Sequence, residues 1–143
     1  WQNVEAGLPG YSSTDIAFDP KNDSTIVVTY NRYQDDAKKI YISHDRGASW
    51  SNITSNLNNM PLRTVVIDQA EDRNIYVGGE IGVYYMPMGG SEWKLLGNEL
   101  PNVTVKDLKI NYGAKTLKAA SWGRGLWQHL LIGKESAILS PIV

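Results

Sequence analysis

The stretch WSNITSNLNN, residues 50–59, decides the fold, because two more phrases in the chain are built in the same way. WQNVEAGLPG occupies residues 1–10, and WKLLGNELPN occupies residues 93–102. Each phrase has a tryptophan, two further residues, an aliphatic residue, three more residues and then a leucine. Self-similarity at a spacing of roughly 40 to 50 residues is the signature of a repeat architecture, so the chain is predicted to be a repeat protein.

The segment that follows each phrase repeats as well. Apolar residues alternate with polar ones, or gather in short β-branched runs, which indicates half-buried and fully buried strands. Turn-forming residues separate the runs, and the last unit is one residue shorter at its turn. The aligned segments are TDIAFDPKNDSTIVV (14–28), RTVVIDQAEDRNIYV (63–77) and KDLKINYGAKTLKAA (106–120). A third element then follows in each unit: KIYISHDRGASW, GVYYMPMGGSEW and GLWQHLL.

About four short strands in a repeat of this length predict the blades of a β-propeller, an all-β fold made of four-stranded antiparallel sheets. We name the strands of one unit A, B, C and D, with D opening on the tryptophan. Residues 11–59 and 60–102 are then two complete blades. Residues 105–131 supply strands A to C of a third blade, and residues 1–10 supply its strand D. Residues 132–143 fall outside the repeats and are predicted to be a tail or linker.

Three blades per chain leave the ring open, because propellers contain roughly four to eight blades. Two arrangements would complete it. The chain is either part of a larger propeller with further blades, or two copies join head to tail, each donating its strand D to the other. The second arrangement gives a homodimer with six blades around a two-fold axis, and it is the preferred prediction.

Composition excludes several kinds of partner. The 143 residues carry a net charge of −1, with no basic stripe of the kind that binds nucleic acid. No apolar run is long enough to span a membrane. The chain has no cysteine and only two histidines, so we expect neither a metal site nor a cofactor.

The stretch SHDRGASW, residues 43–50, matches the pattern Ser/Thr-x-Asp-x-Gly-x-Thr/Ser-Trp known as the Asp-box. The ending AASWGRGLWQ, residues 119–128, is similar to the terminal blade of Asp-box propellers. Residues 1–131 therefore resemble the sialidase-like and sortilin-like Asp-box (BNR) repeat β-propellers. The resemblance implies a secreted, extracytoplasmic protein, and it implies little about function, because these propellers host many activities. The residues that fill the box are Ser43, Asp45, Gly47, Ser49 and Trp50.

We interpret the Asp-box as a structural turn. Ser43, His44 and Asp45 cannot converge as a catalytic triad, because adjacent residues of a strand point to opposite faces. The aligned stretch PMGGSEW, residues 87–93, keeps the glycine and the tryptophan but has Met88 in place of the aspartate. What both units share is the turn and its packing anchor.

The resemblance places functional sites on the opposite face, which carries the D–A and B–C loops. The candidate catalytic carboxylates there are Glu80 and Asp36. The B–C loop at residues 31–38 is an insertion relative to the other units, and such loops often carry recognition. The candidate ligand-binding residues on this face are Trp122, Arg124, Glu80, Arg32, Tyr33 and Asp35.

The sequence favours a non-catalytic binding or assembly scaffold whose ligand is a glycan or a protein. The alternative is a fragment of a carbohydrate-active propeller enzyme, a glycoside hydrolase similar to the xyloglucanases or the sialidases. A glycosidase needs two carboxylates facing each other at roughly 5 to 9.5 Å. Sialidases also use a cluster of three arginines, whereas only Arg32 and Arg124 fall clearly in B–C loops.

Overall fold

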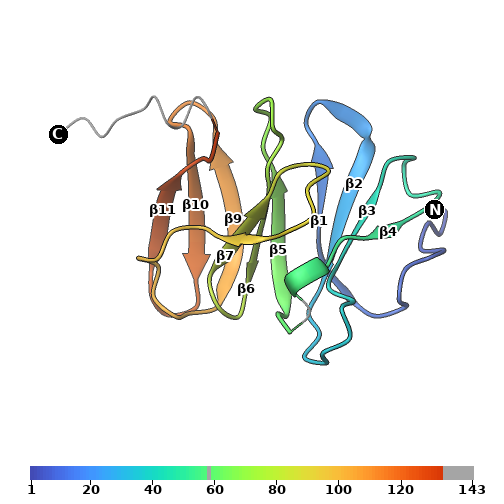
Figure 1. Cartoon of the computed structure of the whole chain (residues 1–143), viewed down its shortest axis with the longest axis horizontal. Helices are drawn as coiled ribbons and strands as arrows, with labels where there is room; N and C mark the ends of the chain where they lie inside the picture. The colour runs from blue at the N-terminus through green and yellow to red at the C-terminus, as the bar shows by residue number, and fades with distance from the viewer. Residues whose placement is uncertain (58, 134–143) are drawn as a thin grey trace.

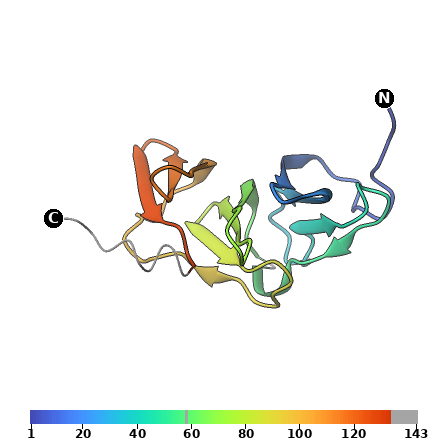
Figure 2. The same cartoon turned by 90° about the horizontal axis from the view of Figure 1, so that it is seen from above.

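The computed structural model describes residues 1–57 and 59–133, and in this part of the chain it contains three antiparallel sheets. Each sheet is formed by consecutive strands, and the three sheets stand side by side (Figure 1). Seen from above, they fan out in an open arc, with the N-terminal segment at one end and β9–β11 at the other (Figure 2). Most of the predicted tail, residues 134–143, lies outside the described residues.

The described residues form eleven strands. The first two sheets have four strands each, and their fourth strands, β4 and β8, are only two residues long. A short 3-10 turn, η1 (Ser55–Leu57), follows β4. The strands are β1 (Ser13–Asp19), β2 (Asn22–Tyr30), β3 (Ile40–Ser43) and β4 (Ser51–Asn52); β5 (Leu62–Ile67), β6 (Ile75–Gly79), β7 (Val83–Met86) and β8 (Lys94–Leu95); β9 (Val105–Asn111), β10 (Thr116–Ser121) and β11 (Leu126–Leu130).

The strand register reproduces the sequence alignment. Ile16 pairs with Val28 in the first sheet, and Val65 pairs with Val77 in the second. In the third sheet Leu108 pairs with Ala119, because the turn between β9 and β10 is one residue shorter. The same residue positions therefore face the same neighbouring sheet in every unit, as strand alternation requires.

The core lies between the sheets. Side chains from facing sheets pack together, so each junction is a layer of aliphatic and aromatic groups. The first layer contains Val27, Ile40, Ile42, Leu57, Leu62, Val65, Ile67, Ile75, Val77, Met86 and Trp93. The second contains Tyr76, Val83, Leu96, Val105, Leu108, Leu117, Ala119 and Leu131.

The predicted all-β class and the blade architecture are confirmed. The third sheet has three strands, in the order β11-β10-β9, and residues 1–10 form no strand. Residues 1–10 instead follow the outside of the first sheet, far from β11 (Figure 2). In the described part of the chain, no helix is long and apolar enough to cross a bilayer.

Candidate functional site: the B–C loop rim

The loops between the second and third strands of each sheet come together at one end of the molecule, at the bottom of Figure 1. They are residues 31–39, 80–82 and 122–125. Antiparallel topology places them at the same end as the D–A connections and opposite the Asp-box turn. We call the following set the rim surface: Tyr33, Glu80, Ile81, Thr104, Trp122 and Arg124.

Glu80 is at the centre of the rim surface. Its Oε1 accepts hydrogen bonds from Arg63 Nε (2.9 Å), Arg63 Nη2 (2.7 Å) and the Tyr33 hydroxyl (3.3 Å). Its Oε2 accepts a hydrogen bond from Thr104 Oγ1 at 2.9 Å. Partial burial opposes ionisation, but the donors outweigh it, so the pKa of Glu80 lies below its usual value. The carboxylate therefore stays ionised and links all three sheets.

Asp36 is also held by cations. Arg32 donates from Nε and Nη2 to Asp36 Oδ2, and Lys39 Nζ donates to Oδ1 at 2.9 Å. The hydrogen bond from Arg32, followed by that from Lys39, places the pKa of Asp36 far below its usual value. The guanidinium of Arg32 also lies 3.5 Å above the centre of the Tyr11 ring. Asp36 thus holds the long B–C loop in shape.

Three large side chains of the rim surface are exposed to solvent. Tyr33 is 70% exposed and Trp122 is 67% exposed, and Ile81 lies exposed on the middle loop. Lys106 Nζ lies 4.4 Å from the centre of the Trp122 ring. Large apolar side chains on three successive loops make a surface on which a planar or ring-shaped ligand can stack.

The structure brings some predicted site residues together and leaves others apart. Tyr33 bonds to Glu80, and Glu80 is linked to Trp122 through Thr104, whose carbonyl accepts the Trp122 backbone N–H at 2.9 Å. Arg124 is exposed on the third loop, and its carbonyl accepts a hydrogen bond from Trp127 Nε1. Asp35 is exposed on the first loop, and Arg32 faces Asp36.

Arg63 and Thr104 are residues of the site that the sequence did not single out. Arg63 is on β5, and Thr104 directly precedes β9. Arg63 lies in a strand A and Thr104 precedes one, so neither residue is in a B–C loop. Arg63 bonds to Glu80 from 17 residues before it in the sequence, and Thr104 from 24 residues after it. The repeat alignment contains one signal that could have pointed to Arg63. Residues 63 and 106 occupy the same position of the repeat, and only residue 63 is an arginine.

The Asp-box lies at the opposite end and is satisfied within its own turn. Asp45 accepts hydrogen bonds from Ser43 Oγ (2.8 Å) and from the backbone N–H of Ser49 (2.8 Å). Gly47 has φ +90°, a conformation that side chains disfavour, and its N–H bonds to Ser43 Oγ. Trp50 Nε1 donates to the carbonyl of Val4 at 2.8 Å. This arrangement shapes a turn and fixes the N-terminal segment, residues 1–10, against it.

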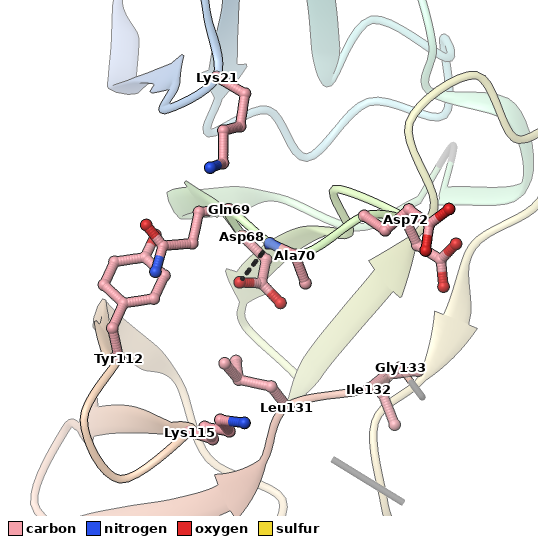
Figure 3. A pocket seen from close by; sticks show the side chains of 11 residues that line it. Lys21, Asp68, Gln69, Ala70, Asp72, Tyr112, Lys115, Leu131, Ile132 and Gly133 are labelled. Atoms are coloured by element: carbon pink, nitrogen blue, oxygen red, sulfur yellow. Dashed lines mark hydrogen bonds between the residues drawn. The ribbon is translucent and has the colours of Figure 1, made fainter. Parts of the chain in front are cut away.

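A cavity of about 300 Å³ lies at the same end as the Asp-box, between the A–B turns of the second and third sheets (Figure 3). Its wall includes Lys21, Lys115 and Tyr112 beside the buried Asp68. Asp68 Oδ1 accepts the N–H of Ala70 within its own turn. No cluster of three or more metal-binding side chains occurs among the residues that the structure describes.

Comparisons with known proteins agree with the fold. An ancestral GH74 enzyme aligns with 77% of this chain and 16% of its own, with a TM-score of 0.56 and 24% identity. The GH74 enzyme of Niastella koreensis aligns with 81% of this chain and 21% of its own, with a TM-score of 0.60 and 15% identity. The extracellular domain of BT4673 from B. thetaiotaomicron aligns with 86% of this chain and 16% of its own, with a TM-score of 0.58 and 14% identity.

These neighbours are β-propeller proteins, and the chain spans only about a sixth to a fifth of their length. No family model matches the chain, and no curated protein matches it. Likeness at this level of identity establishes the fold: the chain consists of β-propeller blades arranged as an incomplete ring.

Proposed function

We propose that the rim surface is a non-catalytic binding site for a neutral, extended polysaccharide. The observation that carries the proposal is the pair of exposed rings, Tyr33 and Trp122, on either side of a fully bonded Glu80. Sugar rings present flat apolar faces that stack on aromatic side chains, while polar neighbours fix their orientation. Two of the similar solved structures are GH74 enzymes, which supports a carbohydrate ligand.

The carboxylates favour binding over hydrolysis. A glycosidase acid needs a raised pKa so that it can donate a proton at neutral pH. Glu80 and Asp36 both have a lowered pKa, because Arg63 holds one and Arg32 holds the other. Each carboxylate accepts protons in hydrogen bonds from its neighbours and has none to give.

Binding is tested by affinity electrophoresis and calorimetry with neutral plant polysaccharides, and with sialylated glycans as a charged comparison. Trp122→Ala and Tyr33→Ala should each weaken affinity about tenfold, the equivalent of about 1.4 kcal/mol. Tyr112→Ala is the matched control, because Tyr112 is a partly exposed aromatic residue at the opposite end of the molecule. Equal binding by all variants would contradict the proposed site.

The enzyme alternative is tested with the same glycans by measuring release of reducing ends. We expect no turnover by the unmodified chain. Hydrolysis that disappears in Glu80→Gln, with the fold intact by circular dichroism, would overturn the non-catalytic assignment.

A further inference from the structure

One hydrogen bond recurs at two places in the chain: between the first two sheets, and between residues 1–10 and the first sheet. Trp93 Nε1 donates to the carbonyl of Ile53 at 2.9 Å, and Trp50 Nε1 donates to the carbonyl of Val4 at 2.8 Å. Ile53 and Val4 both occupy the aliphatic position of the preceding tryptophan phrase. Each tryptophan is therefore an anchor that locks one blade to the tryptophan phrase before it.

The acceptor for a third anchor is present beyond the second sheet. Leu96 occupies the aliphatic position in the phrase at residues 93–102, and a cavity of about 200 Å³ opens beside it. No tryptophan occurs in residues 128–143, and the remaining phrase of the repeat is the one that opens on Trp1. The apolar residues that line the cavity are Val83, Leu96, Leu100, Leu117, Ala119 and Trp127.

Among the described residues, no strand pairs with the outer edge of β11. It pairs with β10 alone there, whereas β3 and β7 each pair with a fourth strand. All five residues of β11 are exposed. An uncovered edge strand is a template for pairing with another chain.

Residues 1–10 have the complementary property, because they carry the strand D phrase but belong to none of the three sheets. Val4 already accepts the Trp50 hydrogen bond, and Leu8 packs against the cluster of Val28, Tyr30 and Tyr41. Trp1 is fully exposed and packs against nothing comparable to the site of Trp93. This segment and β11 lie at opposite ends of the arc, so they cannot meet within one chain (Figure 2).

We propose that residues 1–10 of a second copy of this chain bind along β11, with the indole of Trp1 in the cavity beside Leu96. The register follows from the two complete sheets, in which Ile42 pairs with Ser51 and Tyr85 pairs with Lys94. The corresponding pair joins Gln128 to Gln2 of the second copy. The reciprocal contact closes a ring of six blades in a head-to-tail homodimer.

The strands nearest the centre of the arc carry a second repeated contact. Asp15 Oδ2 accepts the Val65 N–H at 3.0 Å, and Thr64 Oγ1 accepts the Leu108 N–H at 3.2 Å. Asp107 occupies the corresponding position in β9, next to Leu108. In the dimer, Asp107 faces the Ile16 N–H of the second copy. Within one chain this N–H bonds to Asp15 Oδ1 at 2.9 Å, and Asp107 Oδ1 accepts a hydrogen bond from Lys109 Nζ at 3.0 Å. The contact between copies therefore replaces these exposed local bonds.

The facing surfaces predict a dimer that dissociates on dilution. Ile16 and Phe18 are 55% and 58% exposed and form an apolar face on β1. The opposing face of the third sheet carries Lys109 and Lys118, where the second sheet has Val66 and Tyr76. Lysine stems can cover apolar side chains, but dehydrating their ammonium groups has a cost. The junction between copies is therefore weaker than the two within the chain.

Association is measured by light scattering and sedimentation equilibrium over a range of concentrations of the full 143-residue chain. We expect a species of twice the 15.9 kDa chain mass that dissociates on dilution. Trp1→Ala should be monomeric at concentrations where the unmodified chain and Trp122→Ala are dimeric. A monomer at every concentration, or a dimer that Trp1→Ala leaves intact, would overturn the proposal.

The register is tested by a cross-link, because the chain has no cysteine of its own. Facing residues on neighbouring strands are within disulfide range. The double variant Gln2→Cys and Gln128→Cys should form a covalent dimer on mild oxidation. Gln2→Cys with Tyr112→Cys is the control, because Tyr112 lies away from β11 on an A–B turn. Cross-linking no greater than in the control would contradict the pairing of residues 1–10 with β11.

Discussion

Replacing Trp93 tests whether the tryptophan anchors hold the blades together. The side chain is 2% exposed, and it lies in the apolar layer between the first two sheets. Its backbone is fixed as well, because Asn56 accepts the Trp93 N–H at 2.8 Å and donates to its carbonyl at 2.9 Å. Trp93→Ala removes the ring and leaves a cavity, which should lower the free energy of unfolding by about 3 to 5 kcal/mol.

Trp93→Phe separates the hydrogen bond from the packing. In the unmodified chain the indole N–H of Trp93 bonds to the Ile53 carbonyl at 2.9 Å. Phenylalanine fills much of the same space but leaves this carbonyl without its donor. An unsatisfied buried carbonyl costs about 1 to 3 kcal/mol, so this variant should lie between Trp93→Ala and the unmodified chain. It also remains informative if Trp93→Ala fails to fold.

The measurement is equilibrium urea unfolding followed by far-UV circular dichroism. Trp122→Ala is the matched control, because Trp122 is mostly exposed, and its loss should change stability by about 0.5 kcal/mol or less. The reasoning is refuted if Trp93→Ala loses less than about 1 kcal/mol, or if Trp122→Ala is equally destabilised, because burial would then not decide the cost.

Two further predictions concern the middle blade. A Cβ at Gly79 would lie 2.5 Å from the Pro61 carbonyl oxygen, so Gly79→Ala should lower the melting temperature and reduce the free energy of unfolding by about 1 to 3 kcal/mol. Gly113→Ala is the control and should leave the melting temperature unchanged, because the atom closest to a Cβ there is 3.6 Å away. Glu80 has a lowered pKa, so its ionised form stabilises the folded state fully above its unfolded value of 4.5, and this contribution is lost as the pH falls through the folded-state pKa. The stability difference between the unmodified chain and Glu80→Gln should therefore shrink in acid unfolding titrations, and a difference independent of pH would contradict the bond between Glu80 and Arg63.

The repeat pattern predicted the blades because each unit carries its own local signals. Alternating residues and turn formers recur in the same register, and the pairing of Val65 with Val77 follows from them directly. Burial at the ends of the arc could not be predicted in this way. Phe18 aligns with the buried Ile67 but is mostly exposed, because no sheet among the described residues covers that face of β1. Burial depends on a neighbour that a repeat unit does not specify.

The rim was predicted in outline, and its chemistry was not. The loop face and the exposure of Trp122 follow from blade topology. The roles of Glu80 and Asp36 depend on which cation each one meets, and this is a matter of tertiary geometry. Arg63 reaches Glu80 from β5, 17 residues earlier in the chain. A carboxylate in a loop is therefore an ambiguous signal until its partner is known.

The pairing of charges on the rim surface also bears on the kind of ligand that fits. Arg63 and Arg32, the arginines on the Tyr33 side of the rim surface, already bind carboxylates within the chain. An acidic sugar would have to compete with Glu80 for Arg63 and leave a partly buried carboxylate without its cation, which is costly. A neutral sugar ring can stack on Tyr33 or Trp122 without breaking any of these bonds. On the Tyr33 side of the rim surface, the same ion pairs that favour binding over hydrolysis therefore also favour an uncharged polymer over a sialylated one.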